Sequence, residues 1–322
     1  MDKHVIGIDL GGTKIATCAI DKLGNIRGRK IVPTLASKGQ DVVISRIIQC
    51  VYDLLNESNL NIDDVTAIGL AAPGPLDIKN GLMTNPPNLP GWKDVPIVKI
   101  LQHEFKLPVV LENDANSAAL GENLYGSGQG VDYFIYMTVS TGIGGGVVIN
   151  NRILRGSTGN AAEFGHMVIN FEGPICGCKN KGCFEAYASG TALARFARQG
   201  VIEGRKSILA DMIDVEELKA EHVFSAAKKG DDFAMELVRN EGSYLGIGIA
   251  NMANAFDPEL IAIGGGLTRQ WDMFYHQMMN TAKTRLFASK DIQVVKASLD
   301  SDAGLLGIAK LAWDFVDNSL KR

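Results

Sequence analysis

The sequence predicts an α/β protein of layered sheets and helices, and three observations support that prediction. Predicted strands alternate with predicted helices along the chain. The order strand, glycine-rich turn, strand occurs twice, starting at His4 and again at Tyr133. Glycine contributes 36 of 322 residues, above its usual share of about 7%. The repeated unit predicts two lobes with an active cleft between them.

The first repeat begins with a strand over His4–Leu10, which a glycine turn joins to a strand over Lys14–Ile20. A further strand is predicted at Ile26–Pro33. From Asp41, interpreted as a polar helix cap, apolar residues recur every three or four positions, which predicts a helix with one buried face. The next predicted elements are a strand at Val65–Ala72, a Pro-rich loop at Asn85–Trp92, a helix at Val95–Phe105, a strand at Pro108–Leu111 and a helix from Ala115.

The second repeat consists of a strand at Tyr133–Val139, a glycine turn at Ser140–Gly146 and a strand at Val147–Asn150. Later come a strand at Leu260–Ile263, the triplet Gly264–Gly266, and helices at Trp271–Phe287 and Asp302–Leu320. We expect a small lobe over residues 1–114 that the C-terminal helix, about 303–322, rejoins. The large lobe would then span residues 115–302.

Composition narrows the class of protein. Hydrophobic residues make up 46% and charged residues 21%, as in ordinary folded proteins. The net charge of −4 and the lack of a basic tract disfavour a nucleic-acid partner. No apolar run approaches 18 residues and no leader pattern begins the chain, so we expect no membrane association and a cytoplasmic location.

Three predicted strands end in glycine-rich turns, which predict phosphate binding by backbone N–H groups. Asp9 ends its strand and is a candidate to hold magnesium through water. Each turn alone is more typical of a tight hairpin, but three together favour a nucleotide site. Neither the Walker A pattern nor G-x-G-x-x-G fits. The candidate nucleotide-binding residues are Asp9, Gly11, Gly12, Thr13, Lys14, Thr141, Gly142, Gly144, Gly265 and Gly266, with Lys14 alternatively only a surface charge.

His166, Cys176, Cys178 and Cys183 form the pattern H-x9-C-x-C-x4-C. Thiolates and imidazole suit tetrahedral zinc, and four protein ligands would make the metal structural. The alternative is three free thiols in a surface loop. Exposed free thiols are reactive, which favours zinc.

Asp114 stands where a predicted strand passes into an Ala-rich helix. One interpretation is a helix N-cap. The other is a general base that accepts a hydroxyl proton during phosphoryl transfer, since that reaction asks mainly for positioning and charge neutralisation. Both interpretations stay open on sequence alone.

Five segments together resemble the ROK family of sugar kinases and repressors, and the resemblance spans residues 5–310. They are Asp9–Lys14, Glu112–Asn116, Ser140–Gly146, Glu163–His166 and the segment from Cys176 to Glu185. The loop Asn85–Trp92 is similar to that of the bacterial ATP-dependent glucokinases of the family. Lys179 departs from the pattern, because members commonly carry glycine after the second cysteine.

The resemblance implies a two-lobed, actin-like ATPase fold, a duplicated ribonuclease H-like architecture with a cleft between lobes. It implies ATP with Mg²⁺, a structural Zn²⁺, a hexose substrate, and a homodimer or homotetramer. Asp114 would be the catalytic base. Asn88, Asn113, Asp114, Glu163, His166 and Glu185 would hold the sugar, with His166 also binding zinc through its other ring nitrogen.

The function expected from the resemblance is phosphorylation of glucose to glucose 6-phosphate. N-acetylmannosamine, mannose and fructose are alternative substrates, because a methyl or hydroxyl group changes the selectivity of an apolar pocket by only about 1–3 kcal/mol. A sugar-responsive repressor is the alternative from another class. Repressors carry a helix-turn-helix domain before the first strand, which here begins by His4, so we expect an enzyme.

Overall fold

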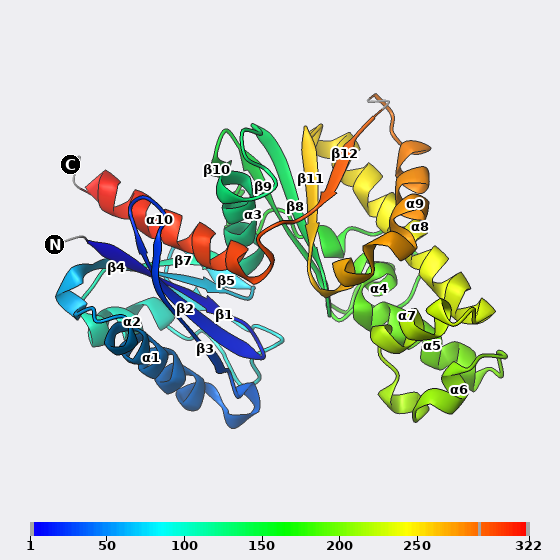
Figure 1. Cartoon of the computed structure of the whole chain (residues 1–322), viewed down its shortest axis with the longest axis horizontal. Coiled ribbons are helices and arrows are strands. Elements are labelled where there is room, and N and C mark those ends of the chain that lie inside the picture. The colour runs from blue at the N-terminus through cyan, green and yellow to red at the C-terminus, as the bar shows by residue number, and fades with distance from the viewer. Residues whose placement is uncertain (1–2, 289–290, 320–322) are drawn as a thin grey trace. The chain divides into compact units, whose positions relative to one another are not determined.

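The computed structural model describes residues 3–288 and 291–319, which fold into two compact units (Figure 1). The first unit comprises Met1–Asp132, Gly146–Ala162 and Leu299–Arg322. The second comprises Tyr133–Gly145 and Glu163–Ser298.

The two five-stranded sheets have the same strand order, which confirms the duplication predicted from sequence. One runs β3 (Ile26–Pro33), β2 (Lys14–Asp21), β1 (His4–Leu10), β4 (Val65–Ala72), β7 (Val109–Asn113). The other runs β10 (Arg152–Ile153), β9 (Ile143–Ile149), β8 (Tyr133–Val139), β11 (Leu260–Gly264), β12 (Gln293–Lys296). In the first sheet β1, β4 and β7 pair in parallel, as do β8, β11 and β12 in the second.

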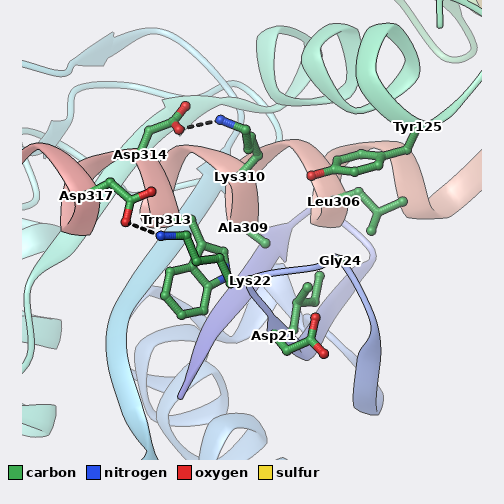
Figure 2. A pocket seen from close by; sticks show the side chains of 11 residues that line it. Asp21, Lys22, Gly24, Tyr125, Leu306, Ala309, Lys310, Trp313, Asp314 and Asp317 are labelled. Carbon is green, nitrogen blue, oxygen red and sulfur yellow. Dashed lines mark hydrogen bonds and ion pairs between the residues drawn. The ribbon is translucent and has the colours of Figure 1, made fainter. Parts of the chain in front are cut away.

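Helix α10 (Ala303–Ser319) packs on one face of the first sheet, beside β1 and β4, so the end of the chain lies against its beginning (Figure 1). Glycine permits this close approach, since a Cβ at Gly69 would lie 2.8 Å from Ile308 Cγ1. A small pocket of about 100 Å³ opens beside α10 (Figure 2), where Lys22 pairs with Asp317 at 2.6 Å and Lys310 pairs with Asp314.

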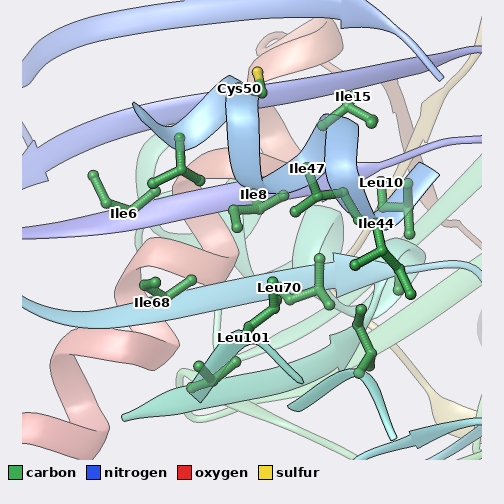
Figure 3. Close-up of a cluster of buried hydrophobic side chains, with 14 of the residues drawn as sticks. Ile6, Ile8, Leu10, Ile15, Ile44, Ile47, Cys50, Ile68, Leu70 and Leu101 are labelled. Atoms are coloured by element: carbon green, nitrogen blue, oxygen red, sulfur yellow. The ribbon is translucent and has the colours of Figure 1, made fainter. Parts of the chain in front are cut away.

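The opposite face of the first sheet is covered by α1 (Gln40–Glu57) and α2 (Ile97–Phe105), which form the core with it (Figure 3). Alternate residues of β1 explain the two faces: Ile6 and Ile8 join this core, whereas Val5 joins the cluster under α10. The predicted cap of α1 is wrong. Gly39 is the N-cap, and Asp41 lies within the first turn.

The remaining elements are mostly helical and belong largely to the second unit. The helices are α3 (Asp114–Tyr125), α4 (Glu185–Ala188), α5 (Gly190–Ile202), α6 (Leu209–Met212), α7 (Ala220–Lys228), α8 (Asp232–Phe256) and α9 (Trp271–Lys283). Two short strands, β5 (Leu76–Asp77) and β6 (Leu82–Met83), pair with each other. Short 3-10 turns are η1 (Ala36–Lys38), η2 (Ile62–Asp64), η3 (Phe164–His166), η4 (Val215–Glu217), η5 (Gly266–Gln270) and η6 (Asp300–Asp302). None of the helices described is both long enough and apolar enough to span a bilayer.

Several boundaries differ from the sequence predictions. β9 begins at Ile143, so Gly144 to Gly146 lie inside a strand rather than in a turn. Helix α9 ends at Lys283, short of the predicted Phe287. The predicted end of the closing helix, Leu320, lies outside the described residues. The predicted elements include none of the helices α4 to α8, although Asp231 caps α8 through its side chain.

The structure groups residues 115–132 and 146–162 with the first unit, whereas the sequence prediction placed them in the large lobe. Packing of α3 on α10 accounts for the grouping of residues 115–132. A Cβ on Gly121 would come within 3.1 Å of the Ala303 Cα, and one on Gly307 within 2.7 Å of the Ser117 carbonyl carbon. The lobe boundaries predicted near residues 114 and 302 remain a prediction.

Candidate functional site

The turn after β1 closes a hairpin with β2, in which Leu10 pairs with Ile15. The Gly11 N–H donates to the Lys14 carbonyl at 2.9 Å, and the buried Thr34 hydroxyl donates to the Gly11 carbonyl at 2.6 Å. Gly12 has no side chain to keep Asn88 away, since a Cβ there would lie 3.0 Å from the Asn88 Cβ. Two residues predicted separately, Gly12 and Asn88, are therefore neighbours.

Asp9 lies at the end of β1, half-buried against α10. A Cβ on Gly304 would be 3.4 Å from the Asp9 carboxylate, so glycine leaves room beside it. Burial raises the pKa of Asp9 from 3.8 to about 6, and the charge of Lys14 opposes that rise. A carboxylate that lacks enough solvation or positive charge suits a site that receives a cation.

The junction of β7 and α3 presents Asn113 and Asp114. Asn113 is the N-cap, and its Oδ1 accepts from the N–H groups of Ala115 at 2.9 Å and Asn116 at 3.1 Å. The interpretation of Asp114 as the cap is therefore wrong. Asp114 occupies the first helical position, where its Oδ1 accepts from the Ala115 N–H at 2.8 Å.

In the second unit, Glu163, His166 and Glu185 lie together. Burial is the main cause that raises the pKa of Glu163, while His166 lowers it and Glu185 raises it. Glu185 begins α4, and its Oε2 accepts from the Ile143 N–H at 2.8 Å. Its other oxygen, Oε1, is 3.6 Å from Cys176 Sγ, so this carboxylate links the start of β9 to the cysteine cluster.

The four predicted zinc ligands converge. One ligand atom from each of His166, Cys176, Cys178 and Cys183 lies within 4.8 Å of the others. Cys178 Sγ and Cys183 Sγ are 3.6 Å apart, near the separation of about 3.8 Å expected for two thiolates at 2.3 Å from a tetrahedral zinc. This donor set therefore fits zinc. Lys179 takes the left-handed conformation, φ 73°, which explains why glycine suits this position.

The other two glycine turns lie against each other. Gly265, with φ 90°, follows β11, and a Cβ there would come within 2.7 Å of the Val139 carbonyl carbon. A Cβ on Gly266 would lie 3.6 Å from the Ser140 hydroxyl oxygen. Gly142 instead faces Glu185, because a Cβ at 142 would lie 3.2 Å from the Glu185 Cδ. Exposed Thr141 accepts at its carbonyl from the Thr191 N–H of α5 at 3.4 Å.

Sequence reasoning missed one ion pair in the first unit, which joins an exposed arginine, 43% accessible, to a buried glutamate. Arg155 Nε donates to Glu112 Oε2 at 2.7 Å, and the Glu112 side chain is only 1% exposed. A glutamate closing an apolar strand gives a weak signal for a buried charge. Nothing in the sequence indicates that its partner lies 43 residues away.

The predicted site residues thus fall into two groups, one in each unit. The first group is Asp9, Gly11, Gly12, Thr13, Lys14, Asn88, Asn113 and Asp114. The second is Thr141, Gly142, Gly144, Glu163, His166, Cys176, Cys178, Cys183, Glu185, Gly265 and Gly266. The pocket beside α10 is lined by none of them.

Two α/β units with matching sheets, glycine turns and a strand-end carboxylate indicate a class of fold, that of the actin-like ATPases. Residues 5–314 match the ROK family, and the chain belongs to that family.

The chain is 37% identical over 314 residues to a glucokinase from Halalkalibacterium halodurans, with 95% of this chain and 94% of that protein covered. A ROK hexokinase from Thermus thermophilus superposes with a TM-score of 0.85 at 36% identity, covering 98% of this chain and 99% of that one. A ROK glucokinase from Streptomyces griseus, solved with glucose and AMPPNP, gives 0.81 at 35% identity, covering 97% and 99%. These structures confirm the predicted fold class.

The relatives also include regulators. A xylose repressor from Caldicellulosiruptor bescii is 31% identical over 311 residues, which cover 94% of this chain and 76% of the repressor. Family membership alone therefore does not separate catalysis from regulation.

Proposed function

We propose that this protein is an ATP-dependent hexokinase that phosphorylates glucose at its 6-hydroxyl. The observation that carries the proposal is the match to glucokinases over nearly the full length of both chains. The position of Asp114 in the first turn of α3 supports it, because the helix N-terminus favours an ionised carboxylate, which is the form that a base requires.

In the proposed reaction, the glucose 6-oxygen attacks the γ-phosphorus of ATP. The new oxygen–phosphorus bond forms as the bond from the γ-phosphorus to the bridging β,γ-oxygen breaks, and ADP leaves with that electron pair. Asp114 accepts the hydroxyl proton. Asn113 has its Oδ1 engaged in capping, which leaves its Nδ2 to donate to a sugar oxygen.

We assign the sugar-holding roles to Asn88, Asn113, Glu163, His166 and Glu185, whose carboxylates, amides and imidazole suit a polyhydroxylated ligand. The glycine turns at residues 11–14, 140–144 and 264–266 would receive the nucleotide, with N–H groups for the phosphates. Asp9 would hold Mg²⁺ through water, and the ion supplies charge neutralisation at the phosphates. We place a structural zinc at His166, Cys176, Cys178 and Cys183, where it would fix the loop that carries His166.

The test is ADP production from ATP and Mg²⁺ with glucose, mannose, N-acetylmannosamine and fructose measured side by side. We expect the highest kcat/KM with glucose. The control is a reaction without sugar, whose ADP release is subtracted as the background. Preference for another hexose would support the assignment as a hexokinase but change the assigned substrate. No turnover with any of the four sugars would overturn the proposal and favour a regulator that binds sugar without transforming it.

A further inference from the structure

We propose that Arg155 is a positioning residue for phosphoryl transfer, acting through Glu112 on the junction that carries Asn113 and Asp114. This inference rests on the proposed function of that junction. Arg155 follows β10 in the segment between Gly146 and Ala162, which belongs to the first unit, as do β7 and α3.

Glu112 holds the junction by two hydrogen bonds at one oxygen. Its Oε1 accepts from the Asn113 backbone N–H at 3.1 Å and from the Asn116 Nδ2 at 3.1 Å. Asn116 is itself buried, and its backbone N–H is one of the two that Asn113 caps. Glu112 therefore fixes the residue before Asp114 and the residue two positions after it.

Arg155 supplies the charge that this arrangement needs. Glu112 is buried at the end of an apolar strand, and a buried carboxylate is costly unless a cation and hydrogen bonds satisfy it. Among the described residues, the 2.7 Å bond from Arg155 Nε to Glu112 Oε2 is the only ion pair that Glu112 forms. The Arg155 carbonyl also accepts from the Ala161 N–H at 3.2 Å, which closes the loop around this residue.

Loss of Arg155 would leave a buried anion without its cation, and the carboxylate would turn toward solvent. That change loosens its hold on Asn113 and Asn116, and so moves Asp114. A displacement of about 1 Å in a reacting group lowers turnover by about 100-fold. We therefore expect Arg155→Ala to lower kcat by about 10- to 100-fold, with little change in the KM for ATP.

The decisive experiment is a cycle of Arg155→Ala, Glu112→Gln and the double variant. Glutamine keeps an oxygen for Asn113 and Asn116 but presents an NH₂ group to Arg155, so Glu112→Gln alone should also lose turnover. In the double variant a neutral amide needs no cation, and we expect its kcat to exceed that of either single variant and to return to within about 10-fold of wild type. Arg155→Lys should recover part of the loss.

Arg152→Ala is the matched control, because Arg152 is an exposed arginine on β10 three residues away, and it should keep wild-type kcat. Thermal unfolding of every variant separates a loss of fold from a loss of positioning, because a loss of positioning lowers kcat in a variant that is still fully folded at the assay temperature. Wild-type kcat in Arg155→Ala, or a double variant no better than Arg155→Ala, would overturn the inference while leaving the proposed function intact. Absence of turnover in the wild type would overturn the proposed function, and this inference with it.

Discussion

At the residue scale, Asp114 occupies a fixed position at the start of α3, where its Oδ1 accepts from the Ala115 N–H. Asn113 takes over the capping role, so the Asp114 carboxylate is not the group that holds the start of the helix. We expect Asp114→Asn to lower kcat by about 10²- to 10⁴-fold, since the amide cannot accept the hydroxyl proton. Glucose binding, measured by calorimetry, should stay within a few-fold of wild type.

Asp63→Asn, at an exposed carboxylate in η2, is the control for Asp114→Asn and should leave turnover unchanged. Near-normal turnover in Asp114→Asn would remove the assignment of a base.

Asp9 links stability to pH. Its pKa is about 6 in the folded protein and near 3.8 when unfolded, so the folded state binds the proton more tightly. Stability is therefore lost as the pH rises from about 4 to about 6, by about 3 kcal/mol at 1.36 kcal/mol per pKa unit. Asp9→Asn should remove this dependence and be more stable than wild type at pH 7, in urea unfolding without Mg²⁺ or nucleotide. If wild type and Asp9→Asn had the same free energy of unfolding as each other at pH 4 and also at pH 7, that result would contradict the raised pKa of Asp9.

At the element scale, the cysteine loop carries one residue in an unfavourable conformation. Lys179 is exposed and has φ 73°, whereas Cys176 and Asn180 close the turn around it with a 2.8 Å bond. Lys179→Gly should raise the free energy of unfolding by about 0.5–1 kcal/mol, because a side chain in the left-handed region costs about 1–2 kcal/mol. The measurement is urea unfolding. The control is Lys181→Gly, because Lys181 is also exposed but does not have a positive φ. It should not raise the free energy of unfolding, and an increase equal to that of Lys179→Gly would contradict the strain argument.

The same loop should bind about one zinc per chain. Zinc removal by a chelator should weaken glucose binding, because His166 is one of the proposed ligands and Glu185 lies beside Cys176. Zinc release followed with a colorimetric chelator measures the first point, and calorimetry with glucose measures the second. Cys183→Ser should bind substantially less zinc than wild type; full zinc content in that variant would exclude this cluster as the site.

Elements and motifs differ in how well the sequence predicts them. The paired glycine-turn units and the Cys3His spacing could be predicted, because local backbone needs and ligand chemistry determine those residue types. The helix caps could not: Asp41 and Asp114 carry side chains that cap well, but Gly39 and Asn113 take those positions. The Glu112–Arg155 pair also escaped prediction, because only the folded chain brings these two residues together.

At the scale of the whole molecule, the last helix of the chain completes the core of the first sheet. Ile308 is fully buried over Gly7 and Gly69, and these glycines have no side chains that could fill the space left by a smaller residue. Ile308→Ala should therefore lower the free energy of unfolding by about 2–5 kcal/mol through lost burial and a cavity. Phe315→Ala, on the same helix but 46% exposed, should change it much less, and similar losses in urea unfolding would contradict this packing.

The contact between Gly142 and Glu185 has a consequence for how this protein can evolve. A methyl group at position 142 would displace the Glu185 carboxylate, which also bonds to Ile143 and lies beside Cys176. Position 142 can therefore accept a side chain only if residue 185 is shortened or withdrawn at the same time. A substitution at position 142 should accordingly be better tolerated in a variant that also carries a shorter residue at position 185.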